Sequence, residues 1–288
     1  MISSRLFHLW CLFSALLLLS VVGLLLGFIV VKGYPAMGVT LYFGQTAPLD
    51  GLLGLAPIWD GIWPACVGTL SVVSLALLLA LFPGIGCGIW LAQSAPSRCR
   101  ELLTLAVDIL AGFPSILMGL FGFTLILLLR QYLLPNANTS LLLSATCLAL
   151  LILPYLAVTT RTALLALPPS LMITAQALGM SRSQTLGYVL LPQAIRGISG
   201  GIMLAFGRAA EDTAVIMLTG AVANAGLPGG LFERYEALPF TIFYYSAQYQ
   251  SEDELQLAFG AALTLLFITA GLFSLASALL HRTTGNTL

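Results

Sequence analysis

Charge is scarce in this chain. Only 8% of its 288 residues are Asp, Glu, Lys or Arg, whereas soluble domains carry about 25%. Acidic and basic residues number 11 each, so the formal net charge is zero and no basic surface for nucleic acid is expected. Apolar residues make up 59% of the chain and give a mean hydropathy of +1.01. This composition excludes a water-soluble core and predicts an integral membrane protein.

The residues of nucleotide and metal chemistry are also missing. Lys32 is the only lysine and no G-x-x-x-x-G-K-[ST] sequence occurs, which excludes a phosphate-binding loop of that kind. His8 and His281 lie at opposite ends of the chain, and the five cysteines are scattered without a C-x-x-C pair. We therefore expect no catalytic residue, no metal site and no cofactor, and nucleotide energy would have to come from another chain.

Six apolar runs are present, each long enough for a span of about 20 residues. The second belongs to 37 uncharged residues between Asp60 and Arg98. That is too long for one span, and Phe82-Pro83-Gly84 predicts a break or kink there, with a short continuation towards Gln93. The sequence GLPGG at 226–230 is not expected to be helical. The expected spans are 9–31, 63–84, 104–129, 140–160, 197–221 and 255–280. They predict an all-α membrane fold in which residues 1–62 form the first span and a periplasmic loop.

Basic residues are divided unevenly between the two sides of the membrane. Six spans place both termini on one side, which collects seven arginines against three basic residues opposite, and this predicts a cytoplasmic N-terminus in a bacterial inner membrane. The outer loop at 222–255 instead holds five acids among its six charges. The inner set is Arg5, Arg98, Arg100, Arg161, Arg182, Arg196 and Arg282, and the outer set is Lys32, Arg130 and Arg234.

The inner loop at 162–197 has a helical pattern of its own. Pro168-Pro169 ends one helix, and the residues after Ser170 predict a short helix that stops at Gly179. A second short helix is expected from Ser183 to Leu190, ending before Pro192. Periodicity alone leaves two interpretations open: helices lying on the membrane surface, or a rigid knob that fits a groove in a partner protein.

The same loop resembles the EAA signature of ABC importer permeases. In TAQALG…VLLPQAIRGI the residues Ala175, Gly179, Val189, Leu191 and Pro192 are in register, whereas Ile173 and Thr174 replace the acid and the first alanine of the signature. The resemblance implies a type I importer (MetI-like) permease fold over residues 63–282. It also implies that this loop docks on an ATPase dimer. The implied coupling residues are Thr174, Ala175, Ala177, Leu178, Gly179, Leu191 and Pro192.

Three further stretches resemble the phosphate permeases of the PstA type. They are AGFPSILMGLFGF at 111–123, RAAEDTAVIMLTG at 208–220 and EALPFTIFYYSAQ at 236–248. In the second stretch Glu211 stands where the family has glycine, and Asp212 where it has glutamate. The partner permease type, PstC, shares parts of these motifs. The resemblance implies a phosphate import system with a second permease subunit of the PstC type and a periplasmic or surface phosphate-binding protein.

Three ionisable residues lie within the fifth expected span. Arg208, Glu211 and Asp212 are spaced so that both acids can reach the arginine on one helix face. Charges at membrane depth are costly unless they are paired or face water. They are either an ion pair that only orients helix packing or part of a substrate pathway, where an arginine suits an oxyanion. We expect the partner permease to supply a further arginine. The predicted pathway residues are Arg208, Glu211, Asp212, Thr213, Pro114 and Ser115.

Together these patterns predict a permease subunit of an ATP-driven importer, set in membrane lipid and with phosphate as the expected substrate. An importer of another oxyanion such as sulfate, molybdate or tungstate is an alternative. A second alternative is a proton-coupled secondary transporter in which the charged cluster relays protons.

Overall fold

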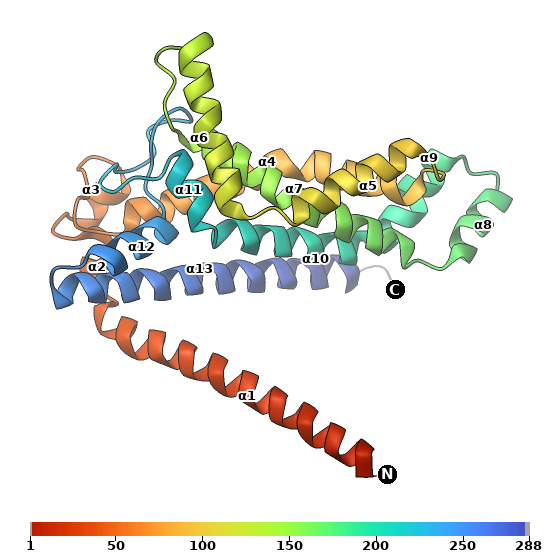
Figure 1. Cartoon of the computed structure of the whole chain (residues 1–288), viewed down its shortest axis with the longest axis horizontal. Helices are drawn as coiled ribbons and strands as arrows, with labels where there is room; N and C mark the ends of the chain where they lie inside the picture. The colour runs from red at the N-terminus through yellow and green to blue at the C-terminus, as the bar shows by residue number, and fades with distance from the viewer. Residues whose placement is uncertain (1, 286–288) are drawn as a thin grey trace.

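The computed structural model describes residues 2–285, without the side chains of residues 2–5, 275–277 and 279–285. The arginines at 5 and 282, used above for orientation, thus have side chains outside the described set. Every regular element in the described chain is helical (Figure 1). The helices are α1 (Ile2–Gly33), α2 (Val39–Phe43), α3 (Pro48–Leu52), α4 (Trp63–Gln93), α5 (Arg98–Ala111), α6 (Ser115–Tyr132), α7 (Leu141–Leu165), α8 (Pro169–Ala177), α9 (Arg182–Gln184), α10 (Leu191–Ala210), α11 (Thr213–Thr219), α12 (Leu238–Gln248) and α13 (Glu252–Gly285).

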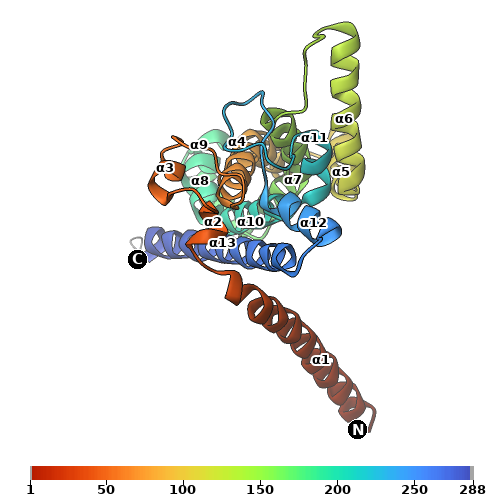
Figure 2. The ribbon, with the colours of Figure 1, turned by 90° about the vertical axis from the view of Figure 1, so that its left-hand side faces the viewer.

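Within the described residues, six helices are long and apolar enough to cross a membrane, which confirms the expected number. They begin at Leu6, Trp63, Ser115, Leu141, Arg182 and Glu252. The buried centre of the bundle is formed by α4, α7 and α10, and α13 lies along one side (Figure 1). Small residues permit this packing: a Cβ at Gly84 would lie 2.7 Å from the Cβ of Leu156, and one at Gly88 would lie 2.6 Å from the carbonyl oxygen of Ala157. Helix α1 projects away from the bundle in both views (Figure 2).

Helix α4 corrects the expectation for the second span. It runs from Trp63 to Gln93 without ending at Pro83, which lies inside the helix. The helix reaches Gln93, the end of the expected continuation, but without the expected break. A proline is tolerated within a membrane helix when neighbouring helices pack around the freed backbone group. Here Ala80, Gly84 and Gly88 on either side of Pro83 are buried.

Two other expected spans are interrupted. The third, expected at 104–129, is divided by Gly112–Pro114 into α5 and α6, because proline cannot donate to the helix and disfavours helical geometry in the residue before it. The fifth, expected at 197–221, ends as a helix at Ala210 and resumes as α11 at Thr213. Both single-helix predictions are wrong at these points.

The inner loop contains the expected short helix α8, and Gly179 follows it with φ +80°, a conformation that glycine adopts without steric cost. The expected end before Pro192 is wrong. Helix α9 passes through a π-helical turn at Thr185–Leu190 directly into α10, so residues 182–210 form one continuous helix. Pro192 lies in the first turn after the π segment. A π turn changes the local hydrogen-bond register, so the helix accommodates a residue without an N–H there.

Candidate functional site

The interruption between α10 and α11 carries the three ionisable residues. Glu211 is the C-terminal cap residue of α10 and Asp212 is the N-terminal cap residue of α11. A chain break inside a membrane helix frees backbone groups that must find partners. The side chain of Asp212 supplies one of these partners, because its Oδ1 accepts the N–H of Val215 at 2.9 Å.

Asp212 also pairs with Arg208. Its second oxygen, Oδ2, lies 3.1 Å from Nη2 of Arg208, and its side chain is only 1% exposed. One carboxylate thus caps α11 and neutralises the arginine at the end of α10. The two oxygens of Asp212 connect the two helices across the break.

Glu211 has a different environment. Its Oε1 is 3.7 Å from Nη1 of Arg208 and its side chain is 69% exposed. The Arg208 side chain is 27% exposed, so it is reachable from the same surface. Both predicted pairings of Arg208 are therefore present, but only the one with Asp212 is buried. Thr213 follows as the first residue of α11 and is half-buried.

The two helix breaks lie at the same level of the bundle. Helix α11 packs on α6: a Cβ at Gly119 would lie 2.9 Å from the carbonyl oxygen of Ala214, and one at Gly122 would lie 2.7 Å from Cγ2 of Thr219. The two helices therefore run side by side in the same direction. One turn before Gly119 lies Ser115, at the level of the break between α10 and α11. The structure places Pro114 and Ser115 near this level, without a hydrogen bond to Arg208 or either acid.

A buried hydroxyl pair holds α11 against α7. The hydroxyl of Thr219 lies 2.8 Å from that of Ser144, and both residues are fully buried. Sequence reasoning missed this contact because the two residues are 75 positions apart and a lone Ser or Thr in an apolar run carries no pairing signal. Helix α11 is thus attached to α7, and so is α10, the helix that carries Arg208.

The inner loop lies at the opposite end of the molecule from α12 (Figure 1). Ala175 is buried and α8 packs against the π-helical segment, whose Leu186 and Leu190 join an apolar cluster with Leu164 and Ala194. Leu191 is half-buried, and Thr174, Ala177, Gly179 and Pro192 are exposed. The structure therefore brings the predicted coupling residues together in one compact loop.

The exposed surface of this inner loop carries large apolar side chains. Leu178 at the Gly179 turn is 78% exposed, Tyr188 77% and Ile173 66%. Ile173 occupies the position of the missing acid. Large apolar side chains projecting from a well-packed loop are typical of a contact surface.

An all-helical membrane bundle with an interrupted, charged span and an exposed apolar inner loop is typical of one class of protein, the transmembrane subunits of ABC importers. Residues 84–284 match the family described as "Binding-protein-dependent transport system inner membrane component". The chain belongs to this family and is a multi-pass inner-membrane permease subunit. Membership in a family of binding-protein-dependent transport systems does not favour the proton-coupled alternative.

Curated relatives are 28–32% identical to this chain over the aligned residues. The phosphate transport system permease protein PstA of Haemophilus influenzae is 32% identical over 242 residues, covering 83% of this chain and 80% of the relative. The probable PstA of Methanocaldococcus jannaschii is 32% identical over 213 residues, covering 74% and 73%. PstC 1 of Mycobacterium tuberculosis is 29% identical over 221 residues, covering 69% of this chain and 65% of the mycobacterial protein.

Solved structures share the fold. A bacterial ABC transporter involved in the import of the acidic polysaccharide alginate has a TM-score of 0.63 at 15% identity, over 95% of this chain and 96% of that chain. The inward-facing MetNI methionine ABC transporter gives 0.61 at 16% identity, over 82% and 99%. At these identities the likeness concerns the fold alone, and it confirms the expected MetI-like architecture.

Proposed function

We propose that this chain is the PstA-type permease of a phosphate importer, with its N-terminus in the cytoplasm. The observation that carries the proposal is Arg208, which lies at a helix break deep in a span and is held by Asp212 at 3.1 Å. A guanidinium in a low-dielectric site suits an oxyanion. The relatives named PstA support phosphate over sulfate, molybdate or tungstate.

Pairing with Asp212 limits how strongly Arg208 binds an anion. A bare arginine in the membrane would hold phosphate tightly, whereas a shared guanidinium offers only part of its five donors. Asp212 remains in place because its other oxygen caps α11. The pathway residues in this proposal are Arg208, Glu211, Asp212, Thr213, Pro114 and Ser115, and the second permease, of the PstC type, lines the other half of the path.

Glu211 leaves the cluster with one more acid than base. Its exposed side chain faces the surface that the second permease would cover. A basic residue of that subunit would complete the balance, since an unpaired carboxylate within a membrane is costly. This proposal makes the earlier prediction more specific, because the basic residue expected from the second permease would pair with Glu211.

The inner loop at 162–197 is the proposed contact with the ATPase dimer. The apolar knob around Leu178 offers shape and hydrophobic area in place of the missing acid at Ile173. From this knob, residues 182–210 continue as one helix of 29 residues, about 43 Å long. The helix ends two residues after Arg208, so a displacement at the ATPase would reach the arginine directly.

Reconstitution tests the proposed function. The chain is assembled with a PstC-type permease, the ATPase and the phosphate-binding protein in proteoliposomes, and ATP hydrolysis is measured with phosphate or with sulfate. We expect phosphate to stimulate hydrolysis and vanadate to abolish uptake. Stimulation by sulfate alone would replace phosphate with another oxyanion, and vanadate-resistant uptake would contradict the ATP-driven mechanism.

A further inference from the structure

An apolar groove lies between α6 and α7 at the outer end of the bundle. Helix α6 projects from the bundle, and the chain returns from its end to the start of α7 (Figure 1). The groove has a volume of about 520 Å³, which is typical of small-molecule pockets. Since the span of α7 begins at Leu141, the groove lies at the level of the outer lipid leaflet. Its apolar walls include Leu125, Ile126, Leu129, Leu134, Leu142 and Leu143.

A polar depression adjoins this groove. Asn138 and Phe232 line both spaces, so the two are neighbours. The depression has a volume of about 410 Å³ and contains a base beside an acid, Arg234 and Glu233, with Thr139 next to them. An apolar groove that ends at a charged depression suits a ligand with an apolar chain and a polar head.

The chain that returns from α6 to α7 is held against α6. Arg130 of α6 donates one hydrogen bond to the carbonyl oxygen of Ala137 and another to Oδ1 of Asn138. Arg130 is thereby engaged within the fold, which leaves Arg234 as the base that a ligand in the depression would meet.

The chain on either side of Phe232 is held as well. The N–H of Leu142 donates to the carbonyl oxygen of Leu231 at 2.8 Å, and the N–H of Leu141 donates to that of Glu233 at 2.9 Å. These bonds fix the outer loop across the first turn of α7. The boundary between groove and depression is therefore formed before a ligand binds, which reduces the entropic cost of binding.

The two charges of the depression are available to a ligand. Among the described residues the ion pairs are those of Arg208, so neither Arg234 nor Glu233 is paired there. Arg234 is also the only base of the outer loop at 222–255, which holds five acids. These acids would repel a ligand with net negative charge, whereas a head that carries both charges is complementary to the depression.

A phospholipid of the ethanolamine type has all the required parts. Its phosphate suits the planar fork of Arg234, and its primary ammonium can donate to Glu233. One acyl chain would fill the apolar groove. A choline head cannot donate from its quaternary nitrogen, a glycerol head lacks the positive charge, and free phosphate makes no use of the groove. Basic pockets between membrane helices are a known mode of binding lipid head groups.

We propose that the groove and the depression together bind one zwitterionic phospholipid of the ethanolamine type from the outer leaflet. The head group lies on Arg234 and Glu233, and the acyl chain lies between α6 and α7. Bound in this way, the lipid connects α6, α7 and the outer loop. The proposal is independent of the ion that the permease transports.

Quenching of tryptophan fluorescence by brominated lipid tests the proposal. Phe232→Trp places a reporter between the two spaces, and the full-length chain with its own four tryptophans provides the background. Each is reconstituted in phosphatidylcholine bilayers that contain a minor fraction of brominated ethanolamine, choline or glycerol phospholipid. We expect the ethanolamine lipid to bind about fivefold more strongly than the other two, the scale of an exposed ion pair.

Two substitutions in the reporter chain separate the charges. Arg234→Gln and Glu233→Gln should each bring the binding of the ethanolamine lipid close to that of the choline lipid. Lys32→Gln is the matched control, because it removes an exposed base from the last turn of α1, and it should leave the preference unchanged. Thr146→Phe places a ring in the groove from an exposed position of α7 and should lower quenching by all three lipids.

Other occupants give different results, and each of these overturns the proposal. A preference for the glycerol lipid that depends on Arg234 alone would indicate an anionic ligand. Loss of quenching on addition of inorganic phosphate would indicate a phosphate site, and loss on assembly with the second permease would assign the groove to that subunit. Equal quenching by the three lipids, or a preference that Arg234→Gln leaves intact, would reject the lipid site.

Discussion

Two buried acids of this permease, Asp212 and Glu236, differ in what surrounds them. Asp212 has a cation and a helix N-terminus for its two oxygens, both from its own chain. Glu236 has backbone N–H donors but no cation. Since a buried charge is costly without a partner, the first acid is complete and the second is not. The difference indicates that Asp212 is paired within its own chain, whereas burial favours the neutral form of Glu236.

The largest expected effect comes from removing the complete acid. Asp212→Ala leaves Arg208 without its buried partner and uncaps α11, so we expect a loss of about 3 kcal/mol in the free energy of unfolding. Thermal unfolding of the chain in detergent measures it. Asp212→Asn is the control, because it keeps a capping oxygen and loses only the charge; equal losses in the two variants would show that the cap contributes nothing.

Replacing the cation should affect transport more than stability. Arg208→Lys keeps the positive charge next to Asp212 but lacks the planar fork, and we expect phosphate uptake to fall about tenfold with normal membrane insertion. Arg208→Ala should reduce uptake further. Uptake in proteoliposomes at matched protein density is the measurement, and wild-type uptake by Arg208→Ala would show that the cluster serves packing alone.

The incomplete acid should make stability depend on pH in a defined direction. The pKa of Glu236 is raised in the folded chain to about 7, so the folded state binds a proton more readily than the unfolded state. Stability should therefore be greatest below the unfolded pKa and decline by about 1–2 kcal/mol as the pH rises through 7. Unfolding midpoints of wild type and Glu236→Gln across this range test it, and a parallel decline in both would contradict the assignment.

The smallest effect is expected at Glu211. Its side chain is 69% exposed and its contact with Arg208 is 3.7 Å, so Glu211→Gln should change the stability of the isolated chain by less than about 0.5 kcal/mol. Co-purification with the second permease should nevertheless weaken if that subunit supplies the countercharge. Unchanged co-purification would remove Glu211 from the interface.

The number of spans and their order followed from the apolar runs, because a bilayer imposes a minimum length on each helix. The positions at which the helices are interrupted did not follow from these apolar runs. Pro83 and Pro154 lie inside continuous helices, whereas Pro114 separates two helices. Proline has the same local effect on the backbone at all three positions. Whether the helix continues depends on the neighbouring helix that packs there, and for α6 that neighbour is α11.

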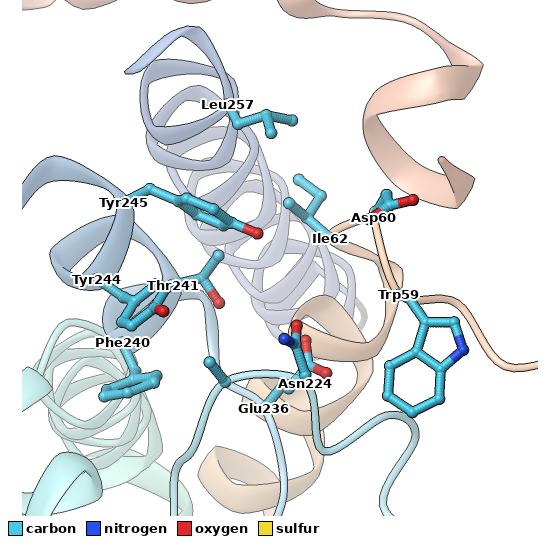
Figure 3. A pocket seen from close by; sticks show the side chains of 12 residues that line it. Trp59, Asp60, Ile62, Asn224, Glu236, Phe240, Thr241, Tyr244, Tyr245 and Leu257 are labelled. Carbon is cyan, nitrogen blue, oxygen red and sulfur yellow. The ribbon is translucent and has the colours of Figure 1, made fainter. Parts of the chain in front are cut away.

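The residues of the charged site were predicted correctly as neighbours, but the geometry of the site was not predicted. Helical spacing correctly paired Arg208 with both acids, yet the helix ends at Ala210. Asp212 followed by Thr213 is a possible N-cap signal, obscured by the apolar run on either side. A small pocket lined by Asp60 and Glu236 (Figure 3) was not predicted, because only the packing of α12 and of the loop before α4 brings these two residues together.

The continuous helix at 182–210 has a mechanical consequence. A rigid rod that turns about its axis moves the side chains at both of its ends through the same angle, so rotation at Leu186 is also rotation at Arg208. Helix α11 is a separate helix held to α7 by the contact between Thr219 and Ser144, and α10 packs on α7 as well. The Arg208–Asp212 pair therefore spans the joint between two helices that both pack on α7. A rotation of the rod relative to α11 would change the length of this pair, which is 3.1 Å in this conformation.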